Sequence, residues 1–408
     1  MRIAKYLERQ PPWLPLRFPV VVRRTLFAGS AGNWQRRWVS YALTMLPPML
    51  VLLALPPSGR ADHVVAVVAT RNSPHQPNGE EIVRGVEAAA RRVNASGGVA
   101  GAPVRVATYS EDCTRERAAE VAQAIARTPP AVVIGHLCAV AAMAAAPIYA
   151  KAGILLIAPG VRHARLTAPP AGPMVFRLAG REDRFGAATA ELIAARHAGA
   201  SVAVLGDRTM QGRALAGGVE HELALRRVAV VLSERLESGE KSYDDLARRI
   251  ATSGAGVVIM PTQPIELGVV AASLRRIGVD APLFGSDVLA VPDVEVLARQ
   301  EGSRLVLMLP WTGVEHRARR RAHSLPIAAL GAVASEAVML RGEAAVEAWA
   351  HAATAVGTAN PAEVASAMRR LTAVTAIGPL RFDATGDAML PSYLPYVWRD
   401  GGWRVLDP

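Results

Sequence analysis

The chain has 408 residues, of which 51% are hydrophobic, and its formal net charge is +11. Because a single hydrophobic core stops growing near roughly 250–300 residues, this length predicts two cores. The basic charge does not indicate a nucleic-acid-binding face, since residues 1–61 hold nine Lys and Arg side chains against one acidic side chain and so carry +8 of the total.

The first 61 residues resemble a leader that directs export. Arg36-Arg37 form a positive region, Trp38–Leu55 form an apolar region, and Gly59-Arg60-Ala61 is a small-x-small cleavage site. Pro47-Pro48 interrupt the apolar region and therefore disfavour a stable transmembrane helix. We predict cleavage after Ala61 and a periplasmic location, with an uncleaved signal anchor as the alternative.

Residues 62–160 alternate between buried strands and helices. Apolar runs predict strands at residues 64–68, 104–109, 131–134 and 154–157. Helices are predicted at residues 79–94 and 115–126, and a third ends near Tyr149. The first helix has an apolar stripe at three- and four-residue spacing, formed by Ile82, Val86, Ala89, Ala90 and Val93. It ends at Asn94-Ala-Ser-Gly-Gly98, whose residues tolerate the left-handed conformation.

A second alternating run follows. Helices are predicted at residues 185–195, 212–225, 243–252 and 267–277, and strands at residues 201–205, 228–232, 257–260 and 283–284. A strand at residues 305–309 then returns the chain, and the alanine-rich helices of residues 327–371 rejoin the first run. The tail predicts two antiparallel strands on either side of Asp400-Gly-Gly402. Two such runs indicate two doubly wound α/β lobes.

Two apolar runs that end in glycine carry the most specific signal. They are Val133-Ile-Gly-His-Leu-Cys138 and Ile154-Leu-Leu-Ile-Ala-Pro-Gly160, and an upstream cysteine, Cys113, completes the pattern. Here the chain resembles the periplasmic leucine/isoleucine/valine-binding proteins of ABC importers, which are type I binding proteins. The phrase formed by Asn94, Gly97, Gly98 and Gly101 matches the same family.

The resemblance implies two Rossmann-like lobes joined by a three-stranded hinge. One lobe would comprise residues 62–180 and 310–390, and the other residues 181–309 and 391–408. The chain would cross between them near Ala179, Leu309 and Leu390. The resemblance also implies a disulfide between Cys113 and Cys138, which suits an exported chain with two cysteines; two buried free thiols are the alternative.

No pattern typical of catalysis is present in the sequence. There is no Gly-x-Ser-x-Gly elbow, no His-Glu-x-x-His pair and no Walker loop. We therefore predict that the protein is not an enzyme and has no catalytic residue, no metal site and no cofactor.

The predicted ligand positions differ from the pattern of the family. Read without gaps, the family's ligand-binding serine and threonine fall on Ala139 and Arg162, and the aromatic residue that closes over the ligand falls on Gln211. Only the acidic partner of the ligand ammonium is kept, as Asp287. Backbone groups of Gly160 and Val161 complete the predicted site. The alternatives are a solvent-facing Arg162 and an Asp287 that is a surface carboxylate or a helix cap.

These features predict an extracytoplasmic solute-binding protein of an ABC importer. It would capture an amino acid or carboxylate in a cleft between the lobes, close by a hinge motion and contact the permease subunits, which are its one link to the membrane. Arginine in place of a hydroxyl favours an anionic or zwitterionic solute over branched aliphatic amino acids. A ligand-sensing subunit that signals to a regulatory partner is the alternative function.

Overall fold

The computed structural model describes residues 61–73, 76–168, 172–289, 293–316 and 328–406. The predicted leader features, residues 36–60, lie outside these ranges. Each predicted strand and helix that falls within them overlaps an observed element.

The first sheet is parallel and has the strand order β2-β1-β3-β4-β5. Its strands are β1 (His63–Thr70), β2 (Val104–Glu111), β3 (Val132–Ile134), β4 (Leu156–Ala158) and β5 (Val175–Arg177). Val65 and Val67 pack toward one face, whereas Ala66 and Val68 pack toward the other. The sheet is therefore buried on both faces, which explains the continuous apolar runs of its strands.

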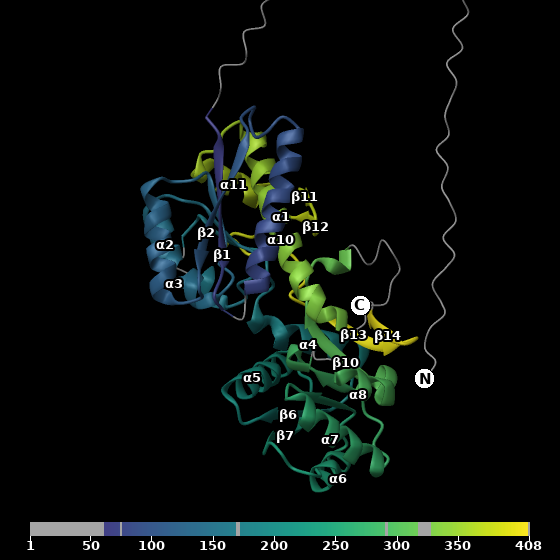
Figure 1. The fold of residues 1–408 in the computed structure, drawn as a ribbon. Helices are drawn as coiled ribbons and strands as arrows, with labels where there is room; N and C mark the ends of the chain where they lie inside the picture. The colour runs from purple at the N-terminus through teal and green to yellow at the C-terminus, as the bar shows by residue number, and fades with distance from the viewer. Residues whose placement is uncertain (1–60, 74–75, 169–171, 290–292, 317–327, 407–408) are drawn as a thin grey trace, which may run out of the picture. The chain divides into compact units, whose positions relative to one another are not determined.

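Helices cover both faces of this sheet (Figure 1). On one face lie α2 (Arg115–Arg127) and α3 (Ala139–Lys151), and on the other lie α1 (Gln76–Ala95), α10 (Ala328–Val356) and α11 (Pro361–Arg370). The alanine-rich helices thus rejoin the first sheet, as the sequence predicts. The hairpin of β11 (Ala373–Thr375) and β12 (Gly378–Leu380) packs against α10.

The second sheet has the strand order β14-β13-β10-β9-β8-β6-β7. Its parallel strands are β6 (Val202–Asp207), β7 (Val230–Leu236), β8 (Val257–Met260), β9 (Leu283–Gly285) and β10 (Leu305–Pro310). The antiparallel strands β13 (Tyr393–Arg399) and β14 (Gly402–Val405) extend it from β10, as the tail pattern predicts.

Two layers of helices also flank the second sheet. α4 (Phe185–Arg196) and α5 (Met210–Leu225) bury one face, and α6 (Asp244–Ser253), α7 (Pro264–Arg276) and α8 (Val294–Glu301) bury the other. Short 3-10 helices occur at Ala164–Leu166, Glu182–Arg184, Asp287–Leu289 and Gly302–Arg304. Two doubly wound lobes of this kind confirm the predicted fold class.

Three crossing segments connect the two sheets and lie side by side. The chain leaves the first sheet after β5, returns after β10 and crosses again before β13. The backbone N–H of Trp311 donates to the carbonyl of Ser392 at 3.1 Å. A side chain at Gly180 would overlap the backbone of Ser392, so glycine allows this close approach. These segments lie close to Ala179, Leu309 and Leu390, and their role as a hinge stays a prediction.

Among the described residues, none of the helices combines the length and the apolar character that a membrane span requires. The same residues contain no cluster of three or more His, Cys, Asp or Glu side chains that would hold a metal ion.

Candidate solute-binding site

The loop after β4 positions the central residue of the candidate site, Arg162. Val161 is 1% exposed and packs into the core between the sheet and α3, so it anchors the loop. The carbonyl of Arg162 accepts a hydrogen bond from the backbone N–H of Glu182 at 3.0 Å. These contacts hold the backbone on either side of the guanidinium and aim it toward the crossing segments.

The Arg162 guanidinium connects residues that are far apart in the sequence. One terminal nitrogen donates to the Asp287 carboxylate at 2.7 Å, and the other donates to the Tyr393 hydroxyl. Its Nε donates to the carbonyl of Gly180 at 3.4 Å. The guanidinium also lies over the Tyr393 ring, 5.1 Å from the centroid. Arg162 and Asp287 side chains are 24% and 23% exposed, so neither is a freely solvated surface group.

The protonation states of this group follow from burial and charge. Burial alone would lower the pKa of Arg162, but Tyr393 and Asp287 raise it, and the net shift of the pKa is upward. Burial raises the pKa of the Tyr393 phenol, and the opposing influence of Arg162 is weaker. At physiological pH the guanidinium is therefore charged and the phenol is neutral. The phenol can then donate to the carbonyl of Glu182, 3.3 Å away.

The other predicted site residues lie apart from these contacts. Ala139 is the first residue of α3, and Gly160 lies against the Leu137 side chain. Val161 can offer a ligand only its backbone, because its side chain belongs to the core. Gln211 is an exposed residue in the first turn of α5. Their role in binding stays a prediction.

Tyr393 was not among the residues expected from the sequence. It lies 231 residues from Arg162 and begins an antiparallel strand, where an aromatic residue is ordinarily a packing residue. No local pattern distinguishes it from the other aromatic residues of the tail.

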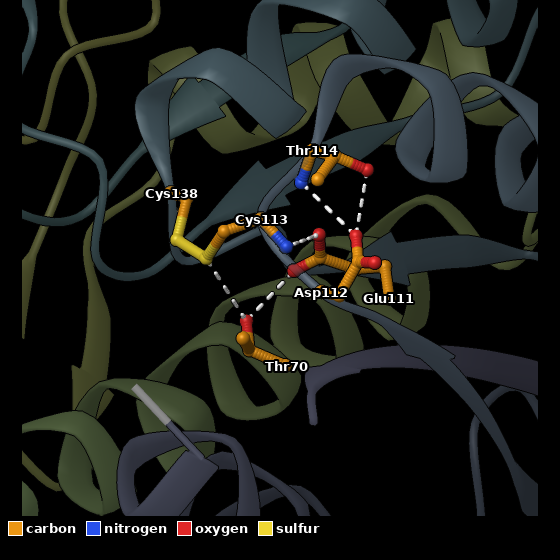
Figure 2. Close-up of a disulfide and its surroundings, with 6 residues drawn as sticks. All are labelled: Thr70, Glu111, Asp112, Cys113, Thr114 and Cys138. Carbon is orange, nitrogen blue, oxygen red and sulfur yellow. Dashed lines mark hydrogen bonds between the residues drawn. A yellow bond between two sulfur atoms is a disulfide. The ribbon is translucent and has the colours of Figure 1, made fainter. Parts of the chain in front are cut away.

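The cysteines join the loops that follow β2 and β3, the two strands that neighbour β1 in the sheet. The structure has a disulfide between Cys113, just after β2, and Cys138, the N-cap of α3. Figure 2 shows the Glu111 carboxylate beside it, where one oxygen accepts from the Thr70 hydroxyl and the other from the backbone N–H of Cys113, each at 2.7 Å. The disulfide thus fixes the start of α3 relative to the ends of β1 and β2.

A buried histidine lies in the same loop. The His136 side chain is fully buried, and its Nε2 is 3.2 Å from the Tyr149 hydroxyl. Nδ1 has no hydrogen-bond partner among the described residues. Burial lowers the pKa of His136 to about 4, so the ring is neutral at physiological pH.

A separate hollow of about 650 Å³ lies at the opposite, amino-terminal edge of the second sheet. Two of its charged lining residues, Arg304 and Glu301, form an ion pair at 3.0 Å. Ligands of doubly wound folds bind beyond the carboxyl ends of the strands, so this hollow is not the candidate site.

Comparisons with known proteins agree with this fold. Residues 64–402 match the family model described as periplasmic binding protein. An amino acid binding protein of Pseudomonas aeruginosa is 28% identical over 345 residues, covering 84% of this chain and 91% of that protein. Leu/Ile/Val-binding protein homolog 1 of Brucella abortus is 27% identical over 382 residues, covering 93% and 97%.

The fold is also similar to solved structures. An ABC transporter substrate-binding protein from Desulfitobacterium hafniense, in complex with Leu, superposes with a TM-score of 0.63 at 20% identity and covers 85% of this chain and 100% of that one. Proteins of this kind bind solutes and are not enzymes, as the sequence predicts. Because the family model spans both lobes, the chain belongs to the periplasmic binding protein family.

Proposed function

We propose that this protein captures an anionic or zwitterionic amino acid or carboxylate and delivers it to the permease of an ABC importer. The lobes would be residues 62–180 with 310–390 and residues 181–309 with 391–408, and the solute would lie between them. The mature protein would begin at Asp62, after export. Closing around the solute would create the surface that the permease recognises.

The ion pair between Arg162 and Asp287 is the observation that carries this proposal. The two charges come from the loop after β4 and the turn after β9, one from each sheet, and meet at 2.7 Å. A zwitterionic solute can insert between them, because its carboxylate replaces Asp287 at the guanidinium and its ammonium replaces Arg162 at the carboxylate. A solute that has only a carboxylate can still accept two parallel hydrogen bonds from the Arg162 guanidinium.

Leucine suits this arrangement less well. The D. hafniense protein is in complex with Leu, but here the positions that match the family's ligand residues hold Ala139, Arg162 and Gln211. An exposed glutamine offers no aromatic face, and alanine offers no hydroxyl. We therefore expect leucine, isoleucine and valine to bind weakly if at all.

Isothermal titration calorimetry of the mature chain against leucine, glutamate, succinate and benzoate tests the proposal. Arg162→Ala should weaken binding of the preferred carboxylate by about 1.5–3 kcal/mol, the usual range for a charged hydrogen bond. Arg165→Ala is a matched control, because Arg165 is exposed and lies three residues away. Micromolar leucine binding that is indifferent to Arg162→Ala would contradict the proposal.

A further inference from the structure

α10 carries a buried arginine, Arg341, that the proposed contacts leave unexplained. The residue is 8% exposed, and its Nε has no hydrogen-bond partner in the part of the chain that the structure describes. A guanidinium stays protonated in proteins, so this position is a buried charge with an unused donor. Buried donors are nearly always paired, and an unpaired one requires an explanation such as a ligand.

The charge that opposes Arg341 is Glu315, but its oxygens are already occupied. They accept from the Thr312 backbone N–H at 3.1 and 3.2 Å, from the Thr312 hydroxyl at 2.9 Å and from the Tyr396 hydroxyl at 2.7 Å. Glu315 therefore supplies countercharge to Arg341 without accepting a hydrogen bond from its Nε.

Arg341 belongs to the same junction as Arg162. Glu315 follows β10, whose last residue, Pro310, lies opposite Tyr393 in the register of the sheet. Tyr393 in turn accepts the hydrogen bond from Arg162. Tyr396, which donates to Glu315, lies on β13 with Tyr393. Burial lowers the pKa of Arg341 to about 10, and the charge of Arg162 acts in the same direction.

We infer that Arg341 is a second anion-binding residue of the solute site, and that the solute is an amino dicarboxylate whose second carboxylate accepts from this guanidinium. The inference rests on the proposed function, in which Arg162 takes the first carboxylate and Asp287 the ammonium. A solute with one carboxylate would leave the Nε of Arg341 buried and unpaired. A second carboxylate accepts a hydrogen bond from this Nε, so the buried donor is no longer unpaired.

Two acid–amide pairs test this in the unaltered mature protein by titration calorimetry. The pairs are aspartate with asparagine and glutamate with glutamine, which differ only in whether the second group is charged. We expect at least one acid to bind tenfold or more tightly than its amide. Amides that bind as tightly as both acids would overturn the inference, and this comparison needs no variant.

The variant Arg341→Met then tests whether Arg341 causes the preference for the acid over its amide. It should bring the acid-to-amide ratio to within twofold, while Arg370→Met, a change at an exposed arginine of α11, should leave the ratio intact. The melting temperature of the ligand-free Met variant is expected to fall, because the buried Glu315 carboxylate loses its countercharge, so the acid-to-amide ratio is the readout of the binding role. A lowered melting temperature with an unchanged ratio would show a purely structural role.

Titration distinguishes failure of the proposed function from failure of the role of Arg341. If neither acids, amides, leucine nor benzoate bind, the proposed function is wrong. If they bind but the acid-to-amide ratio is near one, or survives Arg341→Met, then only the role of Arg341 is wrong.

Discussion

At the scale of single residues, His136 links the candidate loop to the stability of the fold. Its pKa falls from 6.5 to about 4 because the ring is buried. Between about pH 6.5 and pH 4, His136 is therefore protonated in the unfolded chain but neutral in the folded chain. The free energy of unfolding should fall as the pH drops through this range. Burial is the cause of this pKa shift, so the loss is expected to be large.

The measurement is chemical denaturation at pH 7 and pH 4.5. His136→Gln keeps a polar contact for Tyr149 but does not titrate. The unaltered protein should lose about 2–3 kcal/mol more stability between these pH values than the variant does. Equal losses in the two proteins would mean that His136 is protonated in the folded state.

The sequence alone was enough to select Arg162 and Asp287 as candidate site residues, but not Tyr393 or Arg341. Both were predicted from the register of the family's motifs, and the structure brings them together at 2.7 Å. Tyr393 and Arg341 were missed because their significance depends on tertiary neighbours. Tyr393 resembles a strand aromatic, and Arg341 lies in an alanine-rich helix. Only the fold shows that Tyr393 bonds to Arg162 and that the buried Nε of Arg341 has no hydrogen-bond partner among the described residues.

At the scale of elements, α1 and α10 cross at glycines. A side chain at Gly85 would overlap the carbonyl of Met339, and one at Gly342 would meet the carbonyl of Ile82 at 2.9 Å. Gly85→Val should therefore destabilise the protein by about 1–3 kcal/mol, the usual cost of overpacking. Denaturant unfolding of the two proteins measures the difference.

Gly217→Ala is the matched control for this crossing. Gly217 lies inside α5 with open space around its Cβ position, so alanine should stabilise the protein by about 0.5–1 kcal/mol through helix propensity. If the valine at position 85 were tolerated as well as the alanine at position 217, the helices would not pack as described.

The disulfide is a second feature that stabilises the arrangement of elements. Cys113 and Cys138 are 25 residues apart in the sequence, so the bond should restrict the unfolded chain by about 3–3.5 kcal/mol in the entropy model. Cys113→Ser with Cys138→Ser should lower stability by that order. Thiol titration of the exported protein in denaturant should find no free thiol, and two thiols per chain would contradict the pairing.

Short elements escaped prediction for physical reasons. β5 is only Val175–Arg177, and its arginine interrupts the apolar signal of a buried strand. The structure accommodates this buried charge by pairing Arg177 with Asp387 and with the carbonyl of His163 at 2.6 Å. The β11–β12 hairpin has three residues in each strand, too few for a period to show. The longer, periodic elements were predicted with small shifts at their ends.

At the scale of the whole molecule, the crossing segments predict hinge closure. Three segments that run side by side allow rotation about one axis while limiting other motions. Small-angle scattering should show a smaller radius of gyration with saturating solute than without it. An unchanged radius at saturation would argue against closure.

Solute binding should also stabilise the folded chain by mass action. At a hundredfold excess over Kd the expected gain is about 2.7 kcal/mol, visible as a rise in melting temperature. The rise should be absent for Arg162→Ala at the same solute concentration. A similar rise in both proteins would place the binding energy elsewhere.

Native mass spectrometry of the protein purified from the periplasm tests the central claim most directly. The account predicts a mature chain that begins at Asp62 and carries one small molecule, which on release proves to be a carboxylate, and which is lost from the Arg162→Ala variant. Leucine, isoleucine or valine bound equally to both proteins would contradict the claim.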